Sequence, residues 1–113
     1  MIMQVQDEID LHRSCPKYER AVQILGKRWT PVIIRALLGG ARRFSEIAAY
    51  TSPISDRLLS RRLKELEMEG IVERRIYPET PVLIEYTLTP EGAGLQEVVE
   101  AIQRWADRFA EDE

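Results

Sequence analysis

The sequence predicts an α+β fold, mainly α, in which two helices joined by a short turn precede a two-stranded β-hairpin, with further helices at both ends. Apolar residues recur at three- and four-residue spacing in the first seventy residues and again over 90–109, as helices require. Residues 71–88 are instead rich in β-branched and aromatic residues with a period of two. At 113 residues the chain suits one domain, 1–113, with a modest core.

Two helices are expected before the helix pair, at residues 16–25 and 30–38. Gly26 ends the first, since glycine commonly follows the last turn of a helix. Thr30 is the expected N-cap of the second, with Pro31 at the first helical position, where a missing N–H costs nothing. A pair of glycines stops it.

The next segment predicts a helix-turn-helix at residues 45–70. "RRF" reads as a short extended piece, after which Ser45 caps the short helix "EIAAY". "TSPI" is a turn, because Pro53 disfavours a helical conformation for the residue before it. Ser55 caps a longer helix that runs to Gly70, so the two helices and their turn form the motif.

A hairpin and a long helix complete the chain. "IVERRIY" and "VLIEYTL" are expected to pair across a four-residue loop, 78–81, and would form a wing at 71–88. Thr89 and Pro90 are the expected cap and first residue of a final helix, 90–109. Its apolar stripe, the candidate dimer interface, consists of Leu95, Val98, Val99, Ile102, Trp105 and Phe109. The alternative is that this stripe packs on its own domain.

Charge is distributed unevenly along the chain. The net formal charge is −3 and the pI is about 5.3, which on a crude rule argues against nucleic acid. Residues 42–64, however, carry six bases and two acids, a local charge of +4, whereas residues 91–113 carry seven acids and two bases, −5. Because salt screens charges beyond roughly 8 Å, the local surplus is the relevant quantity.

The helix after the turn separates its charges by face. On a helical wheel its leucines lie on one side, and Arg57, Ser60, Arg61 and Lys64 lie on the other. Arg62 falls at the edge of the leucine stripe, where we expect it to pair with a neighbouring carboxylate or a phosphate. One interpretation is a solvated face held by salt bridges.

The arrangement along this helix favours a second interpretation, a helix that reads DNA. Arg57 and Arg61 are a like-charge pair four residues apart, and Glu65, Glu67 and Glu69 lie in the last turns, where the helix dipole disfavours acids. The helix dipole favours acids in the first turns and bases in the last turns, which is the reverse arrangement. A recognition helix, however, inserts its N-terminal residues into the major groove of DNA. The candidate DNA-binding residues are Arg42, Arg43, Ser45, Ser55, Arg57, Ser60, Arg61, Arg62 and Lys64.

Several other classes of protein are not expected. No Ser-His-Asp set or glycine-rich phosphate loop is evident, so we do not expect an enzyme. One histidine and one cysteine cannot supply a structural zinc site, and no cofactor is indicated. The N-terminus lacks the apolar core of a secretory signal, and no apolar run could span a membrane. A single cysteine forms no internal disulfide, so a cytoplasmic location is expected.

Longer motifs resemble a known family over about residues 15–109. These are "CPKYERAVQILGKRWTPVIIRALLGGARRFSEI", "ISDRLLSRRLKELEMEGIVERRIYPETPVLIEYTLTPEG" and "RWADRF". They are similar to the HxlR family of bacterial and archaeal winged helix-turn-helix transcriptional regulators, relatives of the MarR group. The resemblance implies a homodimer on a palindromic DNA operator, a reading helix at 55–69, a wing at 71–88 and dimer contacts through the terminal helices.

The resemblance also bears on one cysteine and on the wing. Some members sense oxidants or electrophiles through an N-terminal cysteine that matches Cys15; a helix N-terminus with Lys17 or Arg13 nearby would favour its thiolate form. The alternative is a small buried apolar residue. The wing departs from the family pattern, because no Lys or Arg lies between Tyr77 and Tyr86. A winged helix that binds proteins and no DNA is the competing function.

Overall fold

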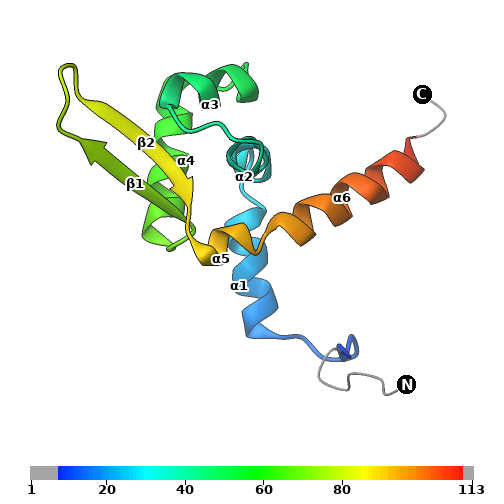
Figure 1. Cartoon of the computed structure of the whole chain (residues 1–113). Helices are drawn as coiled ribbons and strands as arrows, with labels where there is room; N and C mark the ends of the chain where they lie inside the picture. The colour runs from blue at the N-terminus through cyan, green and yellow to red at the C-terminus, as the bar shows by residue number, and fades with distance from the viewer. Residues whose placement is uncertain (1–7, 111–113) are drawn as a thin grey trace, which may run out of the picture.

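The computed structural model describes residues 8–110, which form the expected order of helices around one hairpin (Figure 1). Four helices precede the hairpin and two follow it. In chain order the elements are α1 (Pro16–Leu25), α2 (Thr30–Leu38), α3 (Phe44–Thr51), α4 (Asp56–Met68), β1 (Val72–Tyr77), β2 (Leu83–Leu88), α5 (Pro90–Ala93) and α6 (Gln96–Phe109). The mainly helical α+β class with a two-stranded wing is therefore confirmed.

The core lies between α2, α3, α4 and the start of β1. Its buried hydrophobic residues are Ile33, Ile34, Ala36, Leu37, Ile47, Ile54, Leu59, Leu63, Leu66 and Val72. Three of them are leucines of the stripe predicted for α4. Each fully buried aliphatic side chain contributes about 1.5–3 kcal/mol relative to an exposed one, so this stripe holds α4 firmly against the other helices.

α3 and α4 form the helix-turn-helix. The Ser55 hydroxyl accepts a hydrogen bond from the backbone N–H of Leu58 at 3.1 Å, which caps α4 as predicted. At the other end Gly70 has a φ of +78°, a left-handed conformation that glycine adopts at little cost. The N–H of Ile71 then donates to the carbonyl of Leu66, and the chain turns into β1.

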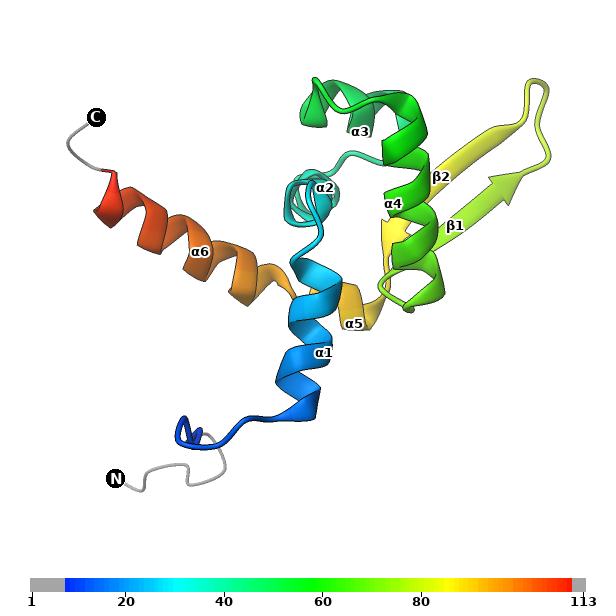
Figure 2. The ribbon, with the colours of Figure 1, turned by 180° about the vertical axis from the view of Figure 1, so that it is seen from behind.

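The hairpin is antiparallel and begins at the core. Val72 pairs with Leu88 and Tyr77 with Leu83, so residues 78–82 form the loop, one residue longer than expected. Val72 is buried, whereas Ile76 and Val82 near the loop are exposed. Figure 2 shows the hairpin extending away from the helices beside α4.

Two helix starts differ from the prediction. Trp29, not Thr30, is the N-cap of α2; its φ is +79°, and Thr30 is the first helical residue and is buried. Arg43, not Ser45, precedes α3. There the Glu46 carboxylate, rather than a serine hydroxyl, accepts the N–H of Arg43 at 3.0 Å. Because Glu46, in the first turn of α3, provides this cap, Ser45 is not the cap and lies within the helix.

Two further segments differ from the prediction. "RRF" is extended only in part: Arg43 has an extended backbone, but Phe44 is the first residue of α3. The segment joins no sheet, although the carbonyl of Arg42 accepts a hydrogen bond from the N–H of Tyr86 at 2.7 Å. The expected helix at 90–109 is divided into α5 and α6. Thr89 caps only the short α5, whose Gly92 lies so close to the hairpin that an added Cβ would meet the carbonyl oxygen of Ile71 at 2.2 Å. α5 is thus packed closely on the start of the hairpin, and α6 begins only after Gly94 and Leu95.

The two terminal helices project from this body (Figures 1 and 2). Neither α1 nor α6 contains a buried residue. The radius of gyration is 16.7 Å, whereas a compact domain of this length would have about 13 Å. Among residues 8–110 no helix is both long and apolar enough to cross a membrane.

Candidate nucleic-acid interface

One side of α4 is a continuous basic surface, the basic face, made of Arg57, Ser60, Arg61 and Lys64. All four residues are exposed, while the leucines on the opposite side are buried or half-buried, as the helical wheel predicts. Within residues 8–110 none of the three bases forms an ion pair. The positive charge of this face is therefore available to an external anion.

Two more bases lie at the start of α3. The side chains of Arg42 and Arg43 are exposed, and Ser45 is exposed in the first turn. The Glu46 carboxylate accepts the backbone N–H groups of Arg42 at 2.9 Å and Arg43 at 3.0 Å. These hydrogen bonds lower the pKa of Glu46, and the bond from Arg43 has the larger effect. Glu46 thus fixes the backbone of both arginines and leaves their guanidinium groups exposed.

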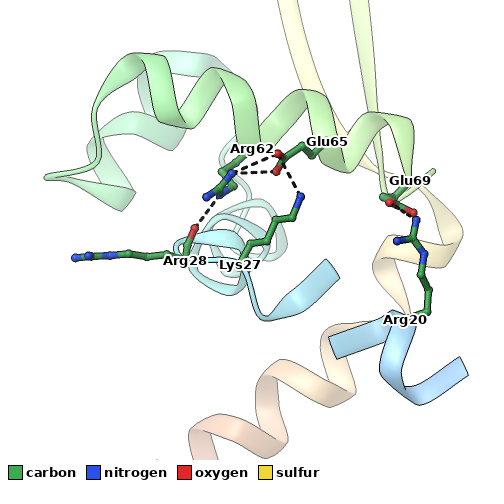
Figure 3. Close-up of polar contacts among 6 residues, drawn as sticks. All are labelled: Arg20, Lys27, Arg28, Arg62, Glu65 and Glu69. Carbon is green, nitrogen blue, oxygen red and sulfur yellow. Dashed lines mark hydrogen bonds and ion pairs between the residues drawn. The ribbon is translucent and has the colours of Figure 1, made fainter. Parts of the chain in front are cut away.

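Arg62 does not belong to the basic face (Figure 3). Its Nε donates to the carbonyl oxygen of Arg28 at 3.0 Å, and its Nη1 donates to Oε1 of Glu65 at 3.2 Å. The side chain is only 16% exposed. Of the two partners expected for Arg62, a carboxylate or a phosphate, the structure contains the carboxylate.

The acids in the last turns of α4 have partners that sequence reasoning did not identify. Oε2 of Glu65 lies 3.3 Å from Nζ of Lys27, which follows α1. Glu69 pairs with Arg20 of α1 (Figure 3). These partners lie about forty to fifty positions away in the sequence, where no local pattern reveals them. Among the described residues, Arg57, Arg61 and Lys64 of α4 thus form no ion pair, whereas Glu65 and Glu69 at its C-terminal end are joined to α1 and the turn after it.

β1 adds a basic residue that sequence reasoning also missed. Arg74 lies on the same side of β1 as the buried Val72 and opposite Tyr86 of β2. It lines a surface hollow together with Ser60 and Lys64 of the basic face. The alternation of side chains along a strand was the signal that could have found it.

Cys15 is exposed at the N-cap of α1, directly before Pro16. Its backbone is extended, with φ −138° and ψ 119°, and its carbonyl accepts the N–H of Glu19 at 3.0 Å. The thiol is therefore accessible, and the alternative of a small buried apolar residue is wrong.

The apolar stripe of the last helix divides between two environments. Leu95 and Val99 are half-buried and pack against the core of their own chain. Val98, Ile102, Trp105 and Phe109 are exposed, Trp105 by 58% and Phe109 by 75%. The rings of the last two are stacked, with centroids 4.8 Å apart. Two of the six candidate interface residues thus contact the chain itself, and four form an uncovered apolar surface.

Comparison with known proteins agrees with this geometry. The model of the HxlR-like helix-turn-helix family matches residues 24–113. The chain belongs to the HxlR-like helix-turn-helix family. Two relatives from Bacillus subtilis (strain 168), both HTH-type transcriptional regulators, are 52% identical to it: YvaP over 95 residues and YodB over 97. The aligned part covers 84% and 86% of this chain, and 88% and 87% of the relatives.

Solved structures of HxlR-like relatives share the fold. The reduced form of the transcriptional regulator YodB from B. subtilis has a TM-score of 0.77 and 50% identity, covering 89% of this chain and 99% of YodB. YodB has also been solved in diamide-treated and quinone-bound forms, each with a TM-score of 0.73. The protein is accordingly a helix-turn-helix transcriptional regulator, and its relatives are regulators, not enzymes.

Proposed function

We propose that the protein binds double-stranded DNA sequence-specifically, as a homodimer on a palindromic operator, and thereby regulates transcription. The observation that carries this proposal is the basic face of α4, which is exposed and free of internal ion pairs among the described residues. α4 inserts into the major groove, where Arg57 or Arg61 can donate two hydrogen bonds to a guanine.

The flanking groups position α4 on the duplex. Arg42 and Arg43 contact phosphates in this proposal, which is supported by their exposed side chains on a backbone that Glu46 fixes. The exposed Ser45 hydroxyl can donate to a phosphate oxygen. The exposed Ser55 hydroxyl accepts the N–H of Leu58 as the α4 cap and keeps its own O–H to donate to a phosphate. Arg62 instead holds α4 against the turn before α2 and contributes to DNA binding only through that orientation.

The homodimer is supported by the uncovered apolar surface of α6. Val98, Ile102, Trp105 and Phe109 expose large apolar side chains on one helix, and Tyr18 and Val22 do so on α1. A twofold axis through this surface would bury it against its own copy. The two α4 helices would then read half-sites about one helical turn of DNA apart, which explains why the operator should be palindromic.

The competing function is a winged helix that binds another protein and no DNA. Two steps distinguish these functions. Duplexes that the protein binds are first selected from a random DNA pool at low salt, and the affinity for the recovered sequence is then measured as the salt concentration is raised. We expect an inverted repeat and an affinity that falls steeply with salt concentration. If no salt-sensitive binding occurred at any DNA concentration tested, the result would support the protein-binding function instead.

Cys15 is proposed to make the regulator responsive to oxidants or electrophiles. Two observations support this: the thiol is exposed at the start of α1, and YodB was solved in diamide-treated and quinone-bound forms. α1 is joined to α4 through Arg20 and Glu69, so a group added at Cys15 can change how the two α4 helices are spaced. Conjugate addition of the thiolate to an electron-poor C=C bond forms one S–C bond, breaks the C=C π bond and takes up one proton from water, so it needs no second cysteine.

Alkylation tests this response. Wild-type protein and Cys15→Ser are treated with a soft electrophile, the adduct is located by mass spectrometry, and operator affinity is measured before and after. We expect the affinity of wild type to change and that of Cys15→Ser to stay constant. Full modification of Cys15 without any change in affinity would show that it is only a surface thiol.

A further inference from the structure

The base of the wing and the basic face of α4 enclose a polar hollow. Arg74 is the third residue of β1 and, two positions after the buried Val72, lies on the strand face that packs against α4. Its cross-strand partner is Tyr86. The hollow has a volume of about 240 Å³ and is lined by Ser60, Lys64, Glu67, Arg74 and Tyr86.

The groups around this hollow suit an anion. Two are cations, two carry hydroxyl groups, and one, Glu67, is a carboxylate. Neither Lys64 nor Arg74 forms an ion pair with any residue the structure describes. The hollow therefore keeps a surplus of one positive charge and several hydrogen-bond donors that no acceptor within residues 8–110 uses.

The next residue of β1 provides the contrast. Arg75 lies on the opposite face of the hairpin, where its Nη2 is 3.2 Å from Oε1 of Glu73. Its cross-strand partner is the acidic Glu85. Arg74 and Arg75 thus have the same charge and nearly the same place in the chain, but one faces α4 and the other is already neutralised.

We propose that Arg74 and Lys64 together bind one phosphate of the DNA backbone beside the groove that α4 enters. This inference rests on the proposed function. The loop at the wing tip, residues 78–82, carries Glu79 and no base. Arg74 supplies the phosphate contact from the base of the hairpin instead, with a planar guanidinium group suited to a phosphate and with Lys64 as a second positive charge.

Glu67 sets the strength of this contact. Its carboxylate lines the same hollow, three residues after Lys64 on α4, and carries the same sign of charge as the phosphate. Its repulsion reduces the affinity for DNA of any sequence, because a phosphate contact carries no base information. Removing this charge is therefore expected to strengthen binding.

The test compares Arg74→Gln with Arg75→Gln on duplex DNA of random sequence, across a salt titration. Each variant removes one charge from β1, but only Arg74 lies in the hollow. We expect Arg74→Gln to bind roughly tenfold more weakly and to lower the salt slope by about 0.9 for each protomer bound. Arg75→Gln should bind within about twofold of wild type, and Arg74→Lys should keep most of the salt slope.

Three outcomes would overturn the inference. Equal losses in the two glutamine variants would mean that only long-range charge matters, and no loss in either would mean that the hollow binds no phosphate. For Glu67→Gln we expect a gain of a few-fold in affinity. Unchanged affinity in this variant would also mean that the hollow binds no phosphate. Wild-type protein that binds no DNA would overturn the proposed function itself. Circular dichroism spectra establish that each variant is folded.

Discussion

Arg62 of α4 donates a hydrogen bond from Nε to the carbonyl oxygen of Arg28, 3.0 Å away and thirty-four residues earlier in the chain. The bond joins the candidate DNA-reading helix to the turn before α2 (Figure 3). The same guanidinium group binds Glu65, whose second carboxylate oxygen binds Lys27. One arginine therefore fixes the orientation of the helix from which its neighbour Arg61 extends into solvent.

The first prediction separates these adjacent arginines by stability. Arg62→Ala should lower the free energy of unfolding by about 1–3 kcal/mol, because it removes partly buried hydrogen bonds from a charged donor. Arg61→Ala should change that free energy by less than about 0.5 kcal/mol, since the side chain is exposed and forms no ion pair with a described residue. Urea denaturation measures both values. Equal stability of the two variants would contradict a structural role for Arg62.

A second prediction concerns acid. The pKa of Glu46 is lower in the folded chain than its ordinary value of 4.5, because its carboxylate accepts the N–H groups of Arg43 and Arg42. Its contribution to stability is therefore full above the unfolded pKa and is lost as the pH falls through the folded pKa. The stability difference between wild type and Glu46→Gln should shrink as the pH falls below about 4.5.

Thermal unfolding from pH 7 to pH 3 checks this dependence. The control is Glu79→Gln, which removes a carboxylate from the exposed wing loop, outside every helix that the structure describes. A difference for Glu46→Gln that is independent of pH would mean that its carboxylate does not cap α3.

The third prediction concerns assembly. Trp105→Glu should convert the proposed dimer into a monomer near 13.1 kDa, because it replaces one ring of the stacked Trp105–Phe109 pair in the exposed stripe by a charge. Arg104→Gln changes the net charge by the same amount from an exposed position beside the stripe and should leave the dimer intact. Light scattering at micromolar concentration measures both masses. A monomeric wild type would contradict the homodimer.

The sequence predicted the elements that local patterns encode. The leucine period placed α4 and its basic face, and Ser55 and Gly70 marked the ends of that helix. Local patterns could not predict long-range contacts. Glu65 pairs with Lys27 and Glu69 with Arg20, which explains why these acids occupy the C-terminal end of α4. Local propensity alone made that arrangement look unfavourable.

Other misses had a tertiary cause. A continuous helix from Pro90 to Phe109 was expected, but the structure divides it at Gly94 and Leu95, after α5 has packed closely on Ile71 through Gly92. Arg74 was overlooked because a base within a strand resembles an ordinary solvent-facing residue. Only the pairing of β1 with β2, and their packing on α4, places it beside Lys64.

The fourth prediction addresses the central claim, that the basic face of α4 reads DNA. Operator affinity is measured at constant salt for wild type, Arg57→Ala and Arg61→Ala, using the sequence selected by the wild-type protein. At least one variant should lose about 1–3 kcal/mol of binding free energy and discriminate less at one base pair of each half-site, because a guanine contact is lost. Wild-type affinity and specificity in both variants would contradict the claim.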